Sequence, residues 1–421
     1  MTIASALTAL NTDIENARTA ITNKGGTVTV GGGSSQLATD IATIPSGITP
    51  TGTINITANG TYGIDTYAYA NVNVPSGISM GIPREVSSGG AYQMPTSSFT
   101  FSLPSNVTSI GAYALAYAFY DCTNPTSVDL SSLTAISSNH VMYYAFTKCT
   151  SLTSIDLSNL TTLSGSYAMR NAFSSSGLIG SVDLSSLTTI SGEGIMQYVF
   201  YNCTNLTSID LSSLTTISGT NSLSDAFDGC TNLTSVDLSS LTTVSGSSVV
   251  SNAFRACTSL TSIDLSSLTT VSGTSAMSSA FYNCTGLTNV SFTNLVTIGE
   301  NSSTANYSQF TSCFNGCTNL TSLTFSKLEK IYCTGGTSTS FGTFASNNRV
   351  QKMYFPKLDT ITYGTGASST NQNACKNVFY GCAALTELHF AAANQAAIEA
   401  SAGYSTAWGR GAGNVTIYFD L

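Results

Sequence analysis

The sequence is poor in charged residues. Only 8% of its 421 residues are Asp, Glu, Lys or Arg, and 13 basic residues stand against 21 acidic ones, which gives a net charge of −8. Binding to nucleic acid depends on basic side chains that neutralise phosphates, so this deficit argues against a nucleic-acid partner. Hydrophobic residues nevertheless make up 42% of the chain. That share is enough to build a core and does not fit a disordered chain.

Catalytic side chains are equally scarce. The chain has two histidines, and its run of three glycines at 31–33 lacks the Lys of a phosphate loop. His140 is expected on the surface near a coil turn, and His389 is expected to follow a strand. No apolar run approaches the length of a membrane span. We therefore expect a non-enzymatic protein without a cofactor and without membrane insertion.

The first residues lack the basic segment and continuous apolar stretch of a secretory signal, so we expect synthesis in a reducing cytoplasm. Apolar residues instead recur at alternating spacings of four and three, which predicts a coiled-coil helix over residues 1–24. Mixed Ile and Leu at the core positions favours a homotrimer, and a single amphipathic helix packed on its own chain is the alternative. The seam consists of Ile3, Leu7, Leu10, Ile14, Ala17 and Ile21.

Two short segments follow this helix. Residues 25–51 combine a strand-like Thr-Val-Thr-Val between glycines, a short helix and a linker. Residues 52–96 begin with alternating apolar and polar residues on either side of Asn59-Gly60, a turn signal that predicts a hairpin in a small β module.

The rest of the chain is governed by a repeat of 27 residues. This period predicts a solenoid over residues 97–390, in which each coil buries its apolar face only against its neighbours. Later coils are longer, with equivalents at Phe314 and Phe379. The repeated positions are Phe119, Phe146, Phe173, Phe200, Phe227, Phe254 and Phe281, and Cys122, Cys149, Cys203, Cys230, Cys257 and Cys284.

Each repeat has two halves. In one half, Ile155 and Leu157 alternate with Ser154 and Asp156, which predicts a short strand in a parallel sheet. In the other half, Met169, Ala172 and Phe173 occupy one helical face. The expected fold is an α/β solenoid, a leucine-rich-repeat stack of about ten coils. A helix at 394–401 and a strand at 414–420, with Trp408, form the expected C-terminal cap over residues 391–421.

The units, written Ala-Phe-x-x-Cys-x-x-Leu-Thr-Ser-Ile, resemble BspA-like leucine-rich repeats, although Asp-Leu-Ser-Ser-Leu-Thr-Thr replaces the usual Ile-Pro stretch. Several terminal segments resemble assembly modules of tailed-phage virion proteins. This second resemblance implies a fibre or spike on the virion surface, with other virion proteins as partners. A structural decoration protein of the virion and a bacterial surface adhesin are the alternatives. The resembling segments are 21–26, 52–62, 391–400 and 414–420.

The repeated cysteines offer two interpretations. Stacked thiols could bind metal or form disulfides, but the units contain no Cys-x-x-Cys and Ser176 occupies one equivalent position. We therefore expect buried structural thiols and no metal site.

A row of aspartates is expected on the outward face of the strands. Like charges at strand spacing repel one another, so a bound cation, a carbohydrate or plain solvation could explain the row. Solvation is the preferred interpretation, and the alternatives stay open. The row consists of Asp129, Asp156, Asp183, Asp210, Asp237 and Asp264.

The outward positions of the predicted helical half differ from coil to coil, whereas the strand face is monotonous. A varied surface rich in Tyr and Arg suits recognition of an irregular partner, here a host-surface glycan or protein. Drift at unconstrained solvent-facing positions is the alternative. The candidate ligand-binding residues on this surface are Tyr143, Tyr144, Arg170, Gln197, Tyr198, Tyr201 and Arg255.

Overall fold

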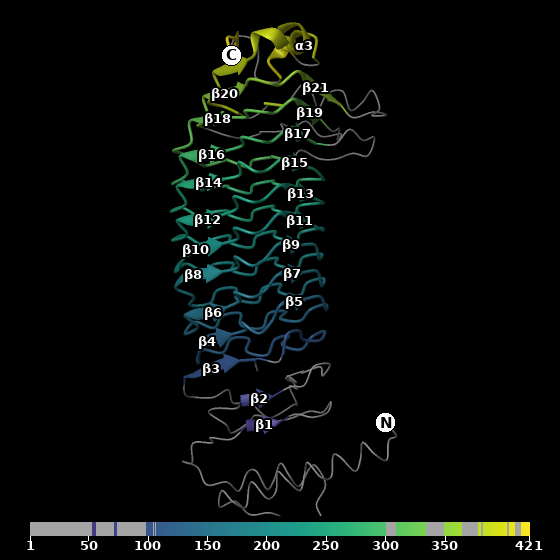
Figure 1. Ribbon diagram of the computed structural model, residues 1–421. Coiled ribbons are helices and arrows are strands. Elements are labelled where there is room, and N and C mark those ends of the chain that lie inside the picture. The colour runs from purple at the N-terminus through teal and green to yellow at the C-terminus, as the bar shows by residue number, and fades with distance from the viewer. Residues whose placement is uncertain are drawn as a thin grey trace, which may run out of the picture.

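The computed structural model describes residues 53–55, 71–73, 98–299 except 104 and 106, 309–333, 349–363, 378–379, 382–401, 404–408 and 414–421. From residue 98 onwards they form a β-solenoid of about ten coils stacked on one another (Figure 1). A regular coil has three sides. We call them the first sheet wall, the second sheet wall and the turn wall, in the order in which the chain meets them.

The first sheet wall is made of parallel strands that repeat once per coil. Ser127 pairs with Ser154 and Val128 with Ile155, so the predicted 27-residue period sets the register. Along each strand apolar side chains point inwards and polar ones outwards, as in the exposed-buried-exposed pattern of Ser154–Asp156. The strands are β3 (Phe99–Ser102), β4 (Pro125–Asp129), β6 (Ser154–Asp156), β8 (Gly180–Asp183), β10 (Leu206–Asp210), β12 (Ser235–Asp237), β14 (Ser262–Asp264), β16 (Asn289–Ser291), β18 (Ser322–Thr324), β20 (Lys352–Phe355), β22 (Glu387–Phe390) and β23 (Thr416–Phe419).

The second sheet wall is a single nine-stranded parallel sheet on the right of the view in Figure 1. A threonine beside the strand strengthens the stacking in several coils: both N–H and Oγ1 of Thr188 donate to the carbonyl of Thr161 in the previous coil, at 2.9 and 3.1 Å. Thr215, Thr242 and Thr269 repeat this arrangement. The strands are β5 (Ala135–Ile136), β7 (Thr162–Leu163), β9 (Thr189–Ile190), β11 (Thr216–Ser218), β13 (Thr243–Ser245), β15 (Thr270–Val271), β17 (Thr297–Ile298), β19 (Lys330–Cys333) and β21 (Thr360–Tyr363).

The turn wall is not helical, so the prediction of an α/β solenoid is wrong. Alternate backbone N–H groups close tight turns within a coil, as from Ala118 to the carbonyl of Leu115 at 3.0 Å. The others donate to the next coil, as from Tyr117 to the carbonyl of Tyr143 at 2.8 Å. Every fourth residue has a positive φ, for example 57° at Tyr117 and 60° at Asp121. This side of each coil is therefore a ribbon of consecutive turns.

Packing geometry explains the absence of helices from the turn wall. An α-helix with its side chains is about 10–12 Å wide, whereas neighbouring strands lie about 4.8 Å apart. One helix per coil could not stack at the strand spacing on a straight solenoid. A flat ribbon of turns keeps that spacing and passes half of its N–H groups to the next coil. Within the described residues, the one α-helix is α3 (Gln395–Glu399), in the C-terminal cap.

The core is a continuous apolar column inside the three walls. The repeated phenylalanines stack face to face from Phe119 to Phe314, with neighbouring ring centroids 4.9–5.6 Å apart. Leucines of the strands and methionines of the turn wall enclose this stack, and nearly all are fully buried. Each ring is therefore shared between two coils, which couples their stabilities.

The C-terminal cap closes the last coil. It contains the predicted helix as η3 (Ala392–Asn394) and α3, a second 3-10 turn η4 (Tyr404–Thr406), and the predicted strand as β23. Trp408 is fully buried and lies 5.8 Å from both Phe379 and Phe390, measured between ring centroids. β23 pairs in parallel with β22, so the cap extends the first sheet wall.

At the other end of the chain, the described residues correct one prediction. β1 (Thr53–Asn55) and β2 (Asn71–Asn73) pair in parallel, with Ile54 opposite Val72. A tight hairpin joins antiparallel strands, so the predicted hairpin between these segments is wrong. The predicted coiled-coil helix with its seam and the short elements of residues 25–51 lie outside the described residues.

Candidate functional site

The turn wall presents its side chains in pairs. Two inward residues alternate with two outward residues, so that Ala172 and Phe173 are buried while Tyr143 and Tyr144 are partly exposed. The second residue of each outward pair has a positive φ, which turns the chain back towards the core. The outward pairs are thus fixed by the backbone and form continuous columns along the solenoid.

Aromatic side chains gather on the outward columns of the first three coils. Tyr113 stacks on His140 at 4.8 Å between ring centroids, and His140 contacts Tyr167 at 5.4 Å. In the neighbouring column, Tyr117 stacks on Tyr144 at 5.3 Å with the two rings nearly parallel. We call this set the tyrosine patch; it comprises Tyr113, Tyr117, Tyr120, His140, Tyr143, Tyr144 and Tyr167.

Two cations lie over rings of the tyrosine patch. The guanidinium of Arg170 lies 5.5 Å from the centroid of Tyr167, and the ammonium of Lys148 lies 5.9 Å from that of Tyr120. The hydroxyl of Tyr167 donates to the carboxylate of Glu193. Burial and the neighbouring phenols raise the pKa of Tyr117 and of Tyr144. These hydroxyls therefore stay protonated and remain hydrogen-bond donors at neutral pH.

An acidic cluster follows on the next coils of the turn wall. Asp225 and Asp228 are only 8% and 5% exposed. The hydroxyl of Ser224 donates to Asp225 at 2.6 Å, and Arg255 forms an ion pair with Asp228 at 3.2 Å. Burial raises the pKa of Asp228 despite the ion pair with Arg255. Burial and the Asp225 carboxylate likewise raise the pKa of Tyr198.

The structure places the seven candidate ligand-binding residues at three locations. Tyr143, Tyr144 and Arg170 lie together in or beside the tyrosine patch. Tyr198 and Tyr201 contact each other at 5.6 Å on the following coil, which also carries Gln197. Arg255 belongs to the acidic cluster.

Five members of the patch, Tyr120 among them, are absent from the candidate residues of the sequence analysis. Tyr113, His140 and Tyr167 occupy one column at intervals of 27 residues, and Tyr117 shares a column with Tyr144. The interval itself was the available signal. The predicted helical face around each phenylalanine does not extend to the column of Tyr113, so the helical interpretation leaves this column out.

The aspartate row has a local structural role. In each coil one carboxylate oxygen accepts the backbone N–H of the serine two residues later, at 2.8–3.0 Å. This contact closes the turn between the two sheet walls and orders the carboxylate. All six side chains are exposed, as expected for a solvated row. Several of these aspartates are direct cross-strand neighbours. Asp129 lies opposite Asp156 in one sheet, and Asp210 lies between Asp183 and Asp237 in another.

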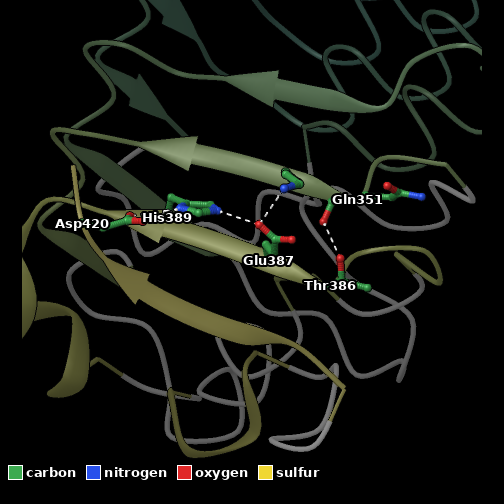
Figure 2. A network of polar contacts seen from close by, with 6 residues as sticks. Gln351, Thr386, Glu387, His389 and Asp420 are labelled. Carbon is green, nitrogen blue, oxygen red and sulfur yellow. Dashed lines mark hydrogen bonds and ion pairs between the residues drawn. The ribbon is translucent and has the colours of Figure 1, made fainter.

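The column of the aspartates changes character at the C-terminal end. There Tyr354, His389 and Tyr418 stack, with 4.7 Å between successive ring centroids. Figure 2 shows His389 between two carboxylates: Nδ1 lies 2.9 Å from Asp420 and Nε2 lies 3.1 Å from Glu387. Lys352 reaches Glu387 at 2.9 Å and lowers its pKa together with His389. His389 lies within β22 rather than after a strand, and the network fastens β23 to the sheet.

The cysteines are buried structural thiols, as predicted. Nine are free and buried among the described residues. In six coils the thiol donates to the carbonyl of the phenylalanine in the preceding coil, at 2.9–3.2 Å. Ser176 takes the place of one cysteine, with its Oγ 3.4 Å from the sulfur of Cys203. Burial raises the pKa of Cys149 to about 12 and that of Cys203 to about 11, which makes both poor nucleophiles.

Among the described residues, no group of three or more His, Cys, Asp or Glu side chains has a geometry that could hold a metal ion. In the same part of the chain, no helix is both long and apolar enough to cross a membrane.

Comparison with known proteins places the repeats in a family. Residues 50–141, 116–225, 193–311 and 224–358 match the BspA type leucine-rich repeat region, in six copies. No curated protein shows significant similarity to the chain.

Among solved structures, the chain is 24% identical to a leucine-rich repeat protein from Bacteroides ovatus, covering 65% of this chain and 78% of that one, with a TM-score of 0.31. It is 20% identical to the leucine-rich repeat protein of T. pallidum, covering 53% and 78%, with a TM-score of 0.30. For the pneumococcal vaccine antigen PcpA the identity is 14%, the coverage 80% and 84%, and the TM-score 0.26. The family match spans most of the solenoid, and the period of the repeats sets the register of the coils. The chain therefore belongs to the BspA-type leucine-rich repeat family.

Proposed function

We propose that this chain is a non-enzymatic recognition protein of a virion surface, a fibre or spike subunit whose turn wall binds a receptor on the host cell. The observation that carries the proposal is the contrast between the walls. The sheet walls repeat Asp, Ser and Thr from coil to coil, whereas the outward pairs of the turn wall change in every coil. Because the backbone holds these pairs in fixed columns, the same scaffold can present many different surfaces.

The virion location is supported by the terminal segments that resemble assembly modules of tailed-phage proteins. In this proposal residues 1–24 assemble a homotrimer and the N-terminal segments attach to other virion proteins, while the solenoid points outwards. Immunogold labelling of intact particles with an antibody against the full chain is expected to decorate the tail or head surface. Labelling of bacterial envelopes in the absence of particles would instead favour the adhesin alternative.

Receptor binding is tested with the purified full chain and whole host cells. A fluorescently labelled chain should bind cells saturably, and a variant with Tyr144→Asn and Arg170→Gln should bind more weakly. Both replacements occur in the same columns of other coils, as Asn171 and Gln197, so the fold should tolerate them. A chain with Asp183→Asn on the first sheet wall serves as the control. Equal binding by all three proteins, equal loss of binding in the two variants, or no binding by any of the three would contradict the proposal and favour a decoration protein.

The assembly is tested separately. Analytical ultracentrifugation of the full chain should give the mass of a trimer, and Leu7→Asp with Leu10→Asp should give a monomer because charges in the seam cannot be buried. A wild-type monomer would remove the trimer and leave receptor binding untouched.

A further inference from the structure

The tyrosine patch differs from the rest of the turn wall in its exposed aromatic surface. Tyr113 is 58% exposed and Tyr117 38% exposed, although both rings stack on a neighbour. From the fourth coil onwards the column of Tyr113 holds Gly194, Asn221 and Ser248, so the rings of this column are confined to one end of the turn wall.

The rings are held in place before any ligand arrives. Stacking between coils fixes the Tyr117 and Tyr144 planes within 9° of each other, and Tyr143 packs edge-on against Tyr144 at 4.7 Å. Ordered aromatic side chains lose little conformational entropy on binding, which makes them effective contact residues. The columns run along the solenoid axis, so a ligand with repeated units can meet one coil after another.

Formal charge in and around the patch cancels. Lys148 and Arg170 contribute two positive charges, while Asp121 and Glu193 contribute two negative ones. Asp121 occupies the column of Lys148 one coil earlier, and Glu193 accepts the hydroxyl of Tyr167. A surface that attracts a charged ligand carries an excess of charge of the opposite sign. The patch carries no such excess. The patch therefore suits a neutral ligand.

Aliphatic side chains are missing from the outward pairs. From Ala116 to Gly316 these positions hold no Val, Ile, Leu, Met or Phe. Protein interfaces usually have an apolar core, whereas a sugar needs flat rings for its C–H face and hydrogen-bonding groups for its hydroxyls. Phenol hydroxyls and the charged side chains supply those groups beside the rings.

Two polar atoms of the region lack a partner. Nδ1 of His140 and Nε of Arg170 are buried without a hydrogen bond to any described residue. Both side chains contact rings of the patch: His140 contacts those of Tyr113 and Tyr143, and Arg170 contacts that of Tyr167. A small shift of these rings around a bound hydroxyl would give both atoms a partner.

We infer that the tyrosine patch is a binding site for a neutral glycan, whose sugar rings lie along the columns of Tyr113 and Tyr117. This inference rests on the proposed function and names the ligand class and the site. Tyr113 and Tyr117 supply the open aromatic surface, and Tyr144 and Arg170 supply hydrogen bonds to hydroxyl groups.

The test uses the full chain and immobilised polysaccharides: dextran, mannan and galactan as neutral probes, polygalacturonate as an acidic glycan and poly-glutamate as an acidic peptide. At least one neutral probe should bind, with little effect of salt. The variant with Tyr113→Asn and Tyr117→Asn should bind that probe about tenfold more weakly, as expected for the loss of aromatic stacking. Asn221 and Asn171 occupy these columns in other coils, which provides the precedent for folding.

The control is Asn252→Ser, a change in the column of Tyr117 far from the patch, for which Ser279 is the precedent. It should bind like the wild type, and circular dichroism should show the same thermal midpoint for all three proteins. Binding only to polygalacturonate or poly-glutamate would overturn the inference, as would neutral binding that the double tyrosine variant retains. If the chain binds host cells but no neutral probe, or if protease treatment of the cells abolishes binding, the glycan site is refuted and the proposed function stands. Failure to bind cells at all refutes the proposed function itself.

Discussion

The buried thiols make the solenoid sensitive to alkali. The pKa of Cys149 and of Cys317 is raised to about 12 and that of Cys203 to about 11, in each case chiefly by burial, from an ordinary value of 9.0. A raised pKa means that the folded state keeps the proton that the unfolded state loses. The stability is therefore intact below pH 9 and declines as the pH rises towards the folded pKa.

The size of the effect follows from these values. At pH 10 an exposed thiol with a pKa of 9.0 is about 90% ionised, so each of the three cysteines costs about 1.4 kcal/mol of folding free energy. Together they remove about 4 kcal/mol, a large share of the 5–15 kcal/mol that stabilises a typical domain. The buried Cys230, Cys257, Cys284 and Cys313, whose pKa values are also raised, add to this loss.

The assay is urea unfolding at pH 7, 8, 9 and 10 under a reductant, followed by circular dichroism. The matched variant carries Cys149→Ser, Cys203→Ser and Cys317→Ser, because the chain itself uses Ser176 at the equivalent position and a serine hydroxyl does not ionise in this range. The variant should be less stable at pH 7 but lose about 4 kcal/mol less than the wild type between pH 8 and 10. Tyrosines with raised pKa values affect both proteins alike. The same pH dependence in both would refute the reasoning.

Three further predictions concern the scaffold. Phe200→Ala should lower the free energy of unfolding by about 3–5 kcal/mol in urea titrations, because the ring is fully buried between Phe173 and Phe227. A loss below about 1 kcal/mol would show that the stack of phenylalanine rings is not continuous. Asp210→Ala should lower the stability by about 0.5–2 kcal/mol in thermal melts. Asp210→Asn should lower it less, because Asn can still accept the hydrogen bond from the Ser212 N–H. Equal losses in both variants would contradict the role of this hydrogen bond in closing the turn. Trp408→Ala should reduce hydrogen-exchange protection first at β22 and β23, whereas an equal loss at β8 would mean that the cap does not act locally.

The sequence predicts the stacking but not the shape of every wall. A 27-residue interval between Phe and Cys is enough to fix the register, and alternation around Ile155 identifies the first sheet wall. Inward residues of the turn wall, such as Ala168, Met169, Ala172 and Phe173, recur in adjacent pairs every four residues. A helical face shares the i, i+3 and i+4 positions of this pattern, and only the additional inward residue at Ala168 distinguishes the two.

The candidate site was predictable only where the pattern was read correctly. The outward pairs Tyr143/Tyr144 and Gln197/Tyr198 have the same positions in a helix and in the turn ribbon, so they were identified. The contacts between neighbouring columns depend on which columns lie side by side, and the conformation of the turn ribbon sets that arrangement. Arg255 and Asp228 lie 27 residues apart, so the repeat places them in neighbouring coils of one column, whereas the burial of Asp228 does not follow from the spacing.

The left-handed backbone positions of the turn wall restrict how this protein can diversify. Tyr, His, Asn, Asp, Ser, Lys, Gly and Ala occupy these columns up to Gly316, and no Val, Ile or Thr does, because branching at Cβ disfavours that conformation. The neighbouring outward position, as at Tyr143 or Arg170, is free of this limit. A library built to change the binding specificity should therefore randomise that position fully. At the positions with a positive φ it should use only the residue types that already occur there. Natural relatives that acquire new specificities are expected to show the same restriction on residue type at these positions.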